Sequence, residues 1–265
     1  MSDTRRQLDE LAAGRARRHS AGDPSRPAQH RPALPVRLDE ILGGAPANVG
    51  RATYWRIDTP FTAVGGTSPL AAWPPGFAWR MAAEARETLD PRRTMLLDIE
   101  TGGLAGAPVF LIGVVLADQQ PLRVLQLLAR DYPEEEAILR AVAELAVERD
   151  TWVTFNGKSF DEPFLRDRAT VHRVPLPSPR VHVDLLHAAR RAWRHRVPDC
   201  RLVTLEQHIL NRPRVGDVSS CDVPDLFHHF MRTGNAAPLR PVLEHNRIDL
   251  VSCAELLVRL AETPR

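Results

Sequence analysis

The sequence has 265 residues, 43% of them hydrophobic, which is enough to bury a full core and predicts one sizeable domain with additions to it. Its 35 Lys and Arg residues against 33 Asp and Glu residues give a formal net charge of +2, too mild to require nucleic acid as a ligand but compatible with it. No apolar run is long enough to span a bilayer and no secretory signal is visible, so no membrane association and a cytoplasmic location are expected.

The N-terminal third differs in composition from the rest of the chain. Residues 1–36 are rich in Arg, Ala and Pro without a sustained hydrophobic period, which predicts a disordered basic arm. Residues 37–93 are expected to form an annex, with a strand or hairpin at residues 48–58 and a short helix at residues 81–89. We expect the annex aromatics to pack it onto the main domain, with base stacking as the alternative. These aromatics are Trp55, Phe61, Trp73, Phe77 and Trp79.

From residue 94 the sequence changes to regular strand and helix patterns, which predicts one domain over residues 94–265. Strands are expected at residues 95–100, 109–117, 122–128, 151–155 and 181–183. Helices are expected from Pro133, from Ser159, and at residues 185–196, 202–210, 223–232 and 239–260. The first three strands suit an antiparallel meander, and the later strands alternate with helices. The expected fold class is therefore α/β, with a mixed sheet and helices packed against it.

Two acids, Asp98 and Glu100, end the first expected strand. The apolar run of Met95 to Leu97 before them is typical of a strand that is buried on both faces. Residues two apart in a strand point to the same side, so the two carboxylates should converge. Because converging acids repel each other and resist burial, we expect a positive charge between them, most simply a divalent metal ion. An Asp-x-Glu pair by itself is also typical of a solvated strand end.

Two later segments add acids at positions that suit the same site. NGKSFD, residues 156–161, places Asp161 near a helix start just past the carboxyl end of a strand, which is where ligands bind in open α/β sheets. HNRID, residues 245–249, lies in the last expected helix, where His245 and Asp249 share one face. Taken alone, the second pair would be read as a surface contact.

Together DIET (residues 98–101), NGKSFD and HNRID resemble the three motifs of the DEDD 3′–5′ exonucleases of the ribonuclease H-like superfamily, in particular the small bacterial YprB-like predicted exonucleases. The resemblance covers roughly residues 94–262. It implies a ribonuclease H-like mixed five-stranded sheet flanked by helices, and a hydrolase that cuts phosphodiester bonds by a two-metal mechanism. It also implies that His245 orients or activates the attacking water. The metal ligands implied by the matching motifs are Asp98, Glu100, Asp161 and Asp249.

The chemistry of phosphodiester hydrolysis fits these residue types. Two divalent ions about 4 Å apart can activate a water and neutralise the leaving oxygen. Four carboxylates suit two such ions, with Mg²⁺ expected and Mn²⁺ also fitting. An imidazole can exchange a proton near neutral pH, so His245 is a candidate base. Its HxxxD spacing leaves open whether it is a base or only positions the water.

Other residues near the motifs are weaker candidates. Lys158, the single lysine of the chain, either reaches a substrate phosphate or points to solvent. Asn156 either binds the phosphate or stabilises the turn, and the turn is favoured. Asp184 is expected to cap a helix rather than to be a fifth metal ligand. The basic stretch at residues 190–196, which contains Trp193, either follows a nucleic-acid backbone or forms a solvated helix face.

These observations predict a metal-dependent 3′–5′ exonuclease whose partner is single-stranded DNA or RNA with a free 3′ end. The direction of cleavage rests on the family resemblance alone. The alternative is a non-catalytic nucleic-acid-binding module on the same fold. The four acids argue against that module, because a binding surface for phosphates has no use for converging carboxylates.

Overall fold

The computed structural model describes residues 38–61, 73, 89–104 and 106–262. The chain divides into two compact units, residues 1–34 and 35–265, and every described residue belongs to the second unit. The predicted basic arm and nearly all of the helix expected at residues 81–89 lie outside the described residues. Among the described helices, none has the length and apolar character needed to cross a membrane.

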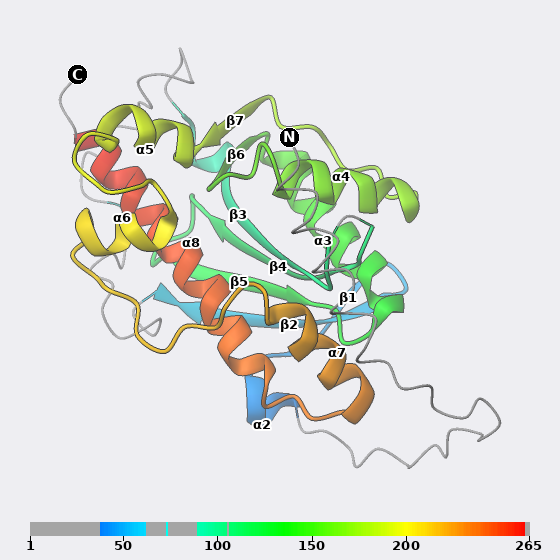
Figure 1. Ribbon diagram of the computed structural model, residues 1–265. Coiled ribbons are helices and arrows are strands. Elements are labelled where there is room, and N and C mark those ends of the chain that lie inside the picture. The colour runs from blue at the N-terminus through cyan, green and yellow to red at the C-terminus, as the bar shows by residue number, and fades with distance from the viewer. Residues whose placement is uncertain (1–37, 62–72, 74–88, 105, 263–265) are drawn as a thin grey trace, which may run out of the picture. The chain divides into compact units, whose positions relative to one another are not determined.

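A seven-stranded mixed sheet forms the centre of the second unit (Figure 1). Across the sheet the strands are β1 (Ala45–Val49), β2 (Ala52–Pro60), β5 (Arg123–Leu128), β4 (Val109–Leu116), β3 (Thr94–Thr101), β6 (Thr151–Thr154) and β7 (Val181–Asp184). Neighbours from β1 to β3 are antiparallel, whereas β3, β6 and β7 run parallel. The α/β class, the five strands expected after residue 94 and the meander of β3, β4 and β5 are therefore confirmed.

The expected number of five strands is wrong, because the annex adds β1 and β2 to the same sheet. β2 pairs antiparallel with β5 over the registers from Trp55–Leu128 to Pro60–Arg123. This pairing covers a strand edge that would otherwise present unpaired backbone groups. The segment predicted as a strand or hairpin at residues 48–58 is this hairpin, and its first strand begins at Ala45.

The described aromatic residues of the annex pack inward, as expected. Trp55 is buried and its Nε1 donates to a backbone carbonyl at 2.8 Å. Phe61 is fully buried, and Nε1 of Trp73 also donates to a carbonyl at 2.8 Å. These three rings belong to the packing of the annex on the main sheet. Phe77 and Trp79 lie outside the described residues.

Helices cover both faces of the sheet. Their bounds are α2 (Leu38–Leu42), η2 (Pro91–Arg93), η3 (Tyr132–Glu134), α3 (Glu135–Glu148), α4 (Asp161–Val171), α5 (Leu185–Trp193), α6 (Leu202–His208), α7 (Val223–Thr233) and α8 (Leu239–Glu262). α3 and α4 pack on one face, and α8 crosses the other face with α5, α6 and α7 around it (Figure 1). The helix expected from Ser159 begins at Asp161, and the expected cap of α5 is confirmed, since the Asp184 side chain accepts from the Leu186 N–H at 3.0 Å.

The central strand β3 contributes to both hydrophobic layers because its side chains alternate. Met95, Leu97 and Ile99 pack into the layer under α3 and α4, whereas Leu96 packs into the layer under α8. Asp98 and Glu100 share the parity of Leu96, so their carboxylates face α8. The alternation thus directs the two acids of the first motif toward the helix that carries the third motif.

α8 lies very close to β4 at Gly113, the residue paired with Asp98. A Cβ atom at this position would lie 2.3 Å from Oδ1 of Asn246 and 2.6 Å from Cδ1 of Leu250. A side chain here would displace the Asn246 amide, which is hydrogen-bonded to Asp98 and to Gln126. Glycine at this position therefore allows the third motif to approach the first.

Candidate active site

Asp98 is held by a row of polar side chains that connects β3, β5 and α8. Nδ2 of Asn246 donates to Oδ2 of Asp98 at 2.8 Å. Gln126 on β5 pairs with Gly113 on β4, and its Nε2 donates to Oδ1 of Asn246 at 2.8 Å. Nε of Arg247 donates in turn to Oε1 of Gln126 at 2.8 Å. The orientation of each amide is fixed by its neighbour, so Asn246 is committed to donating to Asp98.

Asn246 and Gln126 were not predicted as site residues. Asn246 stands inside the HNRID motif, three residues before Asp249, and this helical spacing was a usable signal for a shared face. Gln126 gave no such signal, because only the pairing of β5 with β4 places it beside Asn246.

Asp161 is the first residue of α4 and reaches back to β3. Its Oδ1 accepts from the backbone N–H of Ile99 at 3.2 Å, and the side chain is buried. The parallel pairing of β6 with β3 ends at Leu96, so the N–H of Ile99 lies beyond the last pair with β6. Asp161 supplies the missing acceptor and is thereby placed between Asp98 and Glu100 along the strand.

Asp249 and His245 occupy one face of α8, as the spacing predicted. Nε2 of His245 lies 3.8 Å from Oδ2 of Asp249. The other ring nitrogen, Nδ1, lies 2.8 Å from Oδ1 of Asp217. Arg214 donates to Oδ1 of Asp249, and it also contacts Glu206 and Asp217. The third motif is therefore completed by residues from outside α8.

Sequence reasoning missed Glu206, Arg214 and Asp217. Glu206 looks like an ordinary polar residue on an amphipathic helix, yet it is fully buried. Arg214 is one of 34 arginines and, like Asp217, stands in a connection without hydrophobic period. Only the tertiary structure brings the three residues to the motif helix.

Burial raises the pKa of all four acids named by the motifs. For Asp98 and Glu100 burial is the largest cause, followed by the negative charges of neighbouring acids, which include Asp161 and Asp249. Burial also raises the pKa of Asp161, to about 7, although backbone N–H donors act in the opposite direction. The pKa of Asp249 is raised by burial despite the opposing charge of Arg214. The structure thus brings the four acids into one electrostatic cluster.

The chemistry of this cluster suits a hard divalent cation. It gathers four buried carboxylates, of which Asp249 pairs with Arg214, and hard divalent ions prefer oxygen ligands. Asp98, Asp161 and Asp249 are bonded to protein donors in the structure. In the part of the chain that the structure describes, no three Asp, Glu, His or Cys side chains stand in a ligating arrangement. The residue types and the charge of the cluster therefore fit a divalent metal ion. The side chains themselves are positioned by hydrogen bonds to other residues of the chain.

The second motif is shaped by Asp184. Its two oxygens accept from the backbone N–H of Asn156 at 2.9 Å and of Lys158 at 3.2 Å. Asn156 has a φ of 64°, and a Cβ at Gly157 would lie 2.4 Å from Oγ1 of Thr154. Asp184 therefore stabilises this turn in addition to capping α5. The side chains of Asn156 and Lys158 are exposed near the start of α4.

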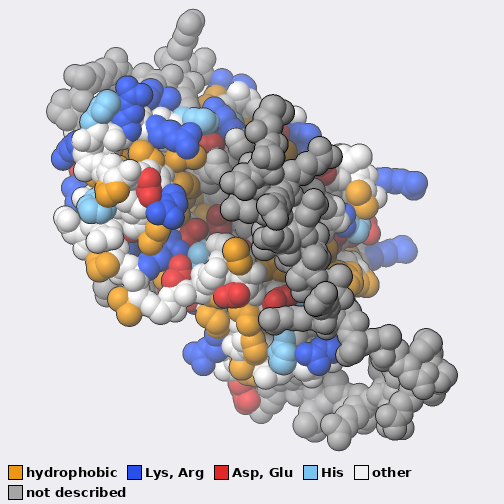
Figure 2. All heavy atoms as spheres, viewed as in Figure 1, with side chains coloured by type: hydrophobic (Ala, Val, Ile, Leu, Met, Phe, Trp, Pro, Cys, Tyr) orange, Lys and Arg blue, Asp and Glu red, His pale blue; other side chains and the backbone are white. Residues whose placement is uncertain are grey.

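The basic stretch at residues 190–196 divides into a buried ring and exposed charges. Trp193 is buried against α8, so its ring is not available for stacking. The exposed arginines of the stretch are Arg190, Arg191, Arg194 and Arg196. Figure 2 shows arginine side chains gathered at the end of the unit where α5 lies.

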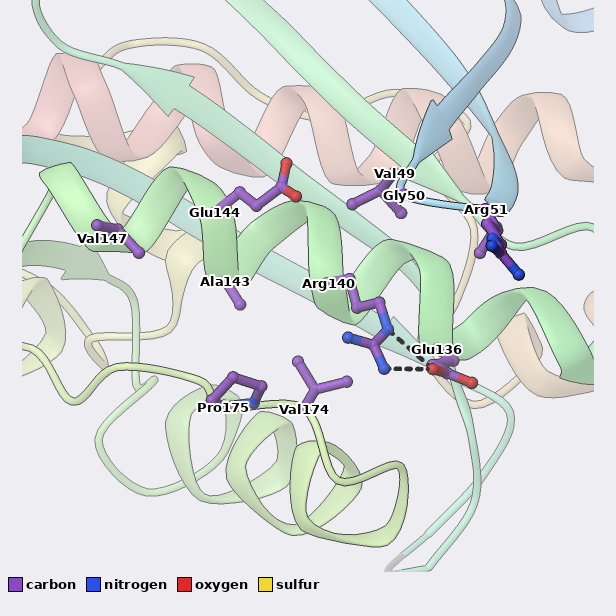
Figure 3. Close-up of a pocket in the computed structure, with 11 residues that line it drawn as sticks. Val49, Gly50, Arg51, Glu136, Arg140, Ala143, Glu144, Val147, Val174 and Pro175 are labelled. Carbon is purple, nitrogen blue, oxygen red and sulfur yellow. Dashed lines mark hydrogen bonds and ion pairs between the residues drawn. The ribbon is translucent and has the colours of Figure 1, made fainter.

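A groove of about 490 Å³ lies away from the acid cluster, against α3 (Figure 3). The turn between β1 and β2, one side of α3 and Val174 with Pro175 line it. Its charged residues Glu136 and Arg140 pair with each other at 2.7 Å. The groove contains none of the motif residues, so the acid cluster remains the candidate site.

Comparison with known proteins agrees with this fold. The chain is 34% identical over 170 residues to the uncharacterized protein YprB of Bacillus subtilis (strain 168), and the match covers 62% of this chain and 41% of YprB. The chain thus spans less than half the length of that relative. The family B DNA polymerase from the hyperthermophilic archaeon Pyrobaculum calidifontis has a similar fold, with a TM-score of 0.53 and 18% identity over 66% of this chain and 25% of the polymerase chain.

A family model decides the assignment. Proteins with an RNase H-like fold are often nucleases, which usually use divalent metal ions and act on nucleic acid. The model of the RNase H superfamily matches residues 95–261, a range that contains α4, nearly all of β3 and α8, and all four acids. The chain therefore belongs to the RNase H superfamily.

Proposed function

We propose that the protein is a metal-dependent 3′–5′ exonuclease that hydrolyses phosphodiester bonds of single-stranded DNA or RNA. The observation that carries the proposal is the burial of Asp98, Glu100, Asp161 and Asp249 in one cluster, where the pKa of each acid is raised. Perturbed acids of this kind gather at functional sites. The 3′–5′ direction rests on the resemblance of the three motifs to those of the DEDD exonucleases.

The four acids would hold two divalent ions, Mg²⁺ or Mn²⁺, which when bound supply positive charge at the phosphate oxygens and make a water more acidic. Asn246 keeps Asp98 oriented by donating to it. His245 presents Nε2 on the side of Asp249, where it can accept the proton of the attacking water. Asn156 and Lys158, exposed near the start of α4, are proposed to contact the substrate phosphate.

The test measures whether binding of a divalent metal ion strengthens binding of the oligonucleotide and allows its hydrolysis. Without metal, the acid cluster should repel a phosphate, and divalent ions should reverse that field. A fluorescent single-stranded oligonucleotide should therefore bind more tightly with calcium, which usually fills such sites without supporting hydrolysis, than with chelator. Supplying Mg²⁺ or Mn²⁺ should then release mononucleotides from the 3′ end of DNA or RNA.

The position of the label measures the direction of cleavage. Loss of a 3′ label as mononucleotide, with progressive shortening of a 5′-labelled strand, is the expected pattern. An oligonucleotide that binds independently of metal, with an affinity that falls steeply with salt, and that remains uncut under every ion would leave the binding module as the explanation.

A further inference from the structure

The connection between α6 and α7, residues 209–222, brings Arg214 into contact with the third motif. Its guanidinium donates to Glu206 through Nε at 2.5 Å and Nη2 at 2.7 Å, to Asp217 through Nη1 at 2.7 Å, and to Asp249 through Nη2. Only 9% of the Arg214 side chain is exposed. A single arginine is thus bonded to three carboxylates, one of which is a proposed metal ligand.

Glu206 fixes this guanidinium in place and balances its charge. Glu206 is fully buried, and the hydroxyl of Ser252 on α8 donates to its Oε1. Two parallel N–H···O bonds between an arginine and a carboxylate set orientation as well as distance. Arg214 also opposes the rise in the pKa of Asp249, but Glu206 and Asp217 share its single positive charge. Because Glu206 holds the guanidinium in place, the contact with Asp249 fixes the position of that carboxylate as well.

The contact leaves the two oxygens of Asp249 in different surroundings. Oδ1 accepts from Arg214, whereas Oδ2 lies toward His245, 3.8 Å from Nε2. Oδ1 has one of its lone-pair sites occupied by the guanidinium, so Oδ2 is the less engaged oxygen. Arg214 thus fixes the rotation of the Asp249 carboxylate and leaves Oδ2 as the oxygen that would face a metal ion.

Asp217 fixes the ring of His245 in the same way. Its Oδ1 lies 2.8 Å from Nδ1 of His245, and its Oδ2 accepts from Arg214. A carboxylate oxygen can only accept, so Nδ1 must carry the proton that it donates to Asp217. The approach of Arg214 Nη1 to Nδ1, at 3.3 Å, is then a contact between two donors and not a hydrogen bond. In the neutral ring this arrangement leaves Nε2 with a free electron pair.

We propose that Arg214 and Asp217 are positioning residues of the active site, with Arg214 setting Asp249 as a metal ligand through one oxygen and Asp217 setting the tautomer of His245. The proposal deepens the proposed nuclease function and rests on it for the effects on turnover. Its effects on metal binding and on the imidazole are independent of turnover.

The first test measures Mn²⁺ binding to the full chain by titration calorimetry. Arg214→Gln should bind Mn²⁺ about 10–100-fold more weakly, the usual effect of removing a group that orients a metal ligand. Arg201→Gln is the control, because Arg201 at the start of α6 is exposed and its guanidinium pairs with Asp199 at 2.7 Å. It should bind Mn²⁺ as the wild type does.

Arg214→Lys covers the case in which Arg214→Gln does not fold. A lysine keeps the charge but cannot bond to Glu206, Asp217 and Asp249 in one plane, so the same weakening is expected. Unchanged Mn²⁺ affinity in a folded Arg214 variant overturns the role of Arg214. Tighter binding overturns it too, because the arginine would then be a competitor of the metal.

The second test compares the His245 ring tautomer of the wild type with that of Asp217→Asn. It uses nitrogen NMR of the metal-free protein at a pH where the imidazole is neutral. The wild type should show the tautomer protonated at Nδ1, and the variant should lose this preference. With Mg²⁺ and oligonucleotide, the variant should lose about 10–100-fold in kcat with little change in KM. An unchanged tautomer together with unchanged kcat overturns the role of Asp217.

The two proposals fail in different ways. A wild-type protein that binds Mn²⁺ but cuts no oligonucleotide contradicts the nuclease function, while the calorimetric and NMR comparisons still decide the roles of Arg214 and Asp217. A wild type that cuts, with variants that match it in metal affinity, ring tautomer and kcat, contradicts the positioning roles alone.

Discussion

Buried acids on the two faces of the sheet have opposite electrostatics. Glu135, at the start of α3, is 2% exposed and accepts from the N–H of Val109 at 2.8 Å, from Arg168 at 2.7 and 2.6 Å, and from His172 at 2.8 Å. Burial acts to raise the pKa of Glu135, but these donors outweigh it and the pKa is lowered. This acid is fully satisfied by the protein.

The acid cluster under α8 is the reverse case. The pKa of each of its four members is raised, first by burial; Asp98 and Glu100 are affected next by the charges of the other acids. A buried carboxylate surrounded by donors stabilises the fold, whereas carboxylates that oppose one another's ionisation need something from outside. The comparison identifies the α8 face as the functional one, and it can be tested by removing an acid from each face.

The largest effect is expected from Asp161→Asn or Asp249→Asn. Each variant should lose hydrolysis of a labelled oligonucleotide by about 10³-fold or more, because a proposed metal ligand is removed. In chelator, the melting temperature should stay the same or rise, since one member of a repelling set becomes neutral. Turnover that persists in both purified variants would contradict the two-metal assignment.

His245→Ala should have the next largest effect, because the ring is proposed to accept the proton of water. If His245 is the base, kcat should fall by about 10²–10⁴-fold and the acidic limb of the pH–rate profile should disappear. A small loss with the limb unchanged would show that the ring only positions water. His208→Ala, which changes the histidine at the exposed end of α6, is a control that should cut as the wild type does.

Glu135→Gln should show the opposite pattern from the acid-cluster variants. The change leaves Arg168, only 15% exposed, without its carboxylate partner. The free energy of unfolding should fall by about 2–4 kcal/mol, measured by urea denaturation. Specific activity of the folded fraction should remain at the wild-type level, because Glu135 is on the other side of the sheet. Loss of activity without loss of stability would break the comparison between the two faces.

The motif acids and His245 could be predicted because each depends on a pattern within a single strand, turn or helix. The parity of Asp98 and Glu100 follows from strand geometry, and the common face of His245 and Asp249 follows from helical spacing. Asp161 follows from its place after a strand. Each inference needs only a few consecutive residues. The five residues inferred in this way, two from β3, one from α4 and two from α8, lie close together in the structure.

The residues that escaped prediction depend on pairing between distant segments. Gln126 lies beside Asn246 only because β5 pairs with β4, and Arg214 meets Asp249 across 35 positions of the sequence. The two extra strands escaped for the same reason: the alternation at residues 48–58 predicts a strand or hairpin without indicating that β5 is its partner. Periodicity describes one element at a time, whereas these contacts are set by how the elements assemble.

The smallest expected effect is a difference in how stability depends on pH, and its sign distinguishes the two faces. The pKa of Asp161 is raised from 3.8 in the unfolded chain to about 7 in the folded protein, so the folded state binds more protons between these values. The contribution of Asp161 is fully present below pH 3.8 and is lost as the pH rises through about 7. The pKa of Glu135 is lowered, so its contribution is present above pH 4.5 and is lost as the pH falls below that value.

Urea denaturation in chelator from pH 4 to pH 8 measures this difference. Between pH 5 and pH 8 the unfolding free energy of the wild type should fall, and Asp161→Asn should flatten that fall, because the asparagine no longer binds the extra proton. Glu135→Gln should leave the slope at pH 5–8 intact and change the curve only near and below pH 4.5. Saturating calcium should oppose the fall, since a cation bound only to the folded state stabilises it most where the acids are ionised. A slope at pH 5–8 that is identical in the wild type and in Asp161→Asn would show that Asp161 ionises in the folded protein as freely as in water. The electrostatic contrast with Glu135 would then fail for Asp161, the member of the cluster that accepts from the backbone of β3.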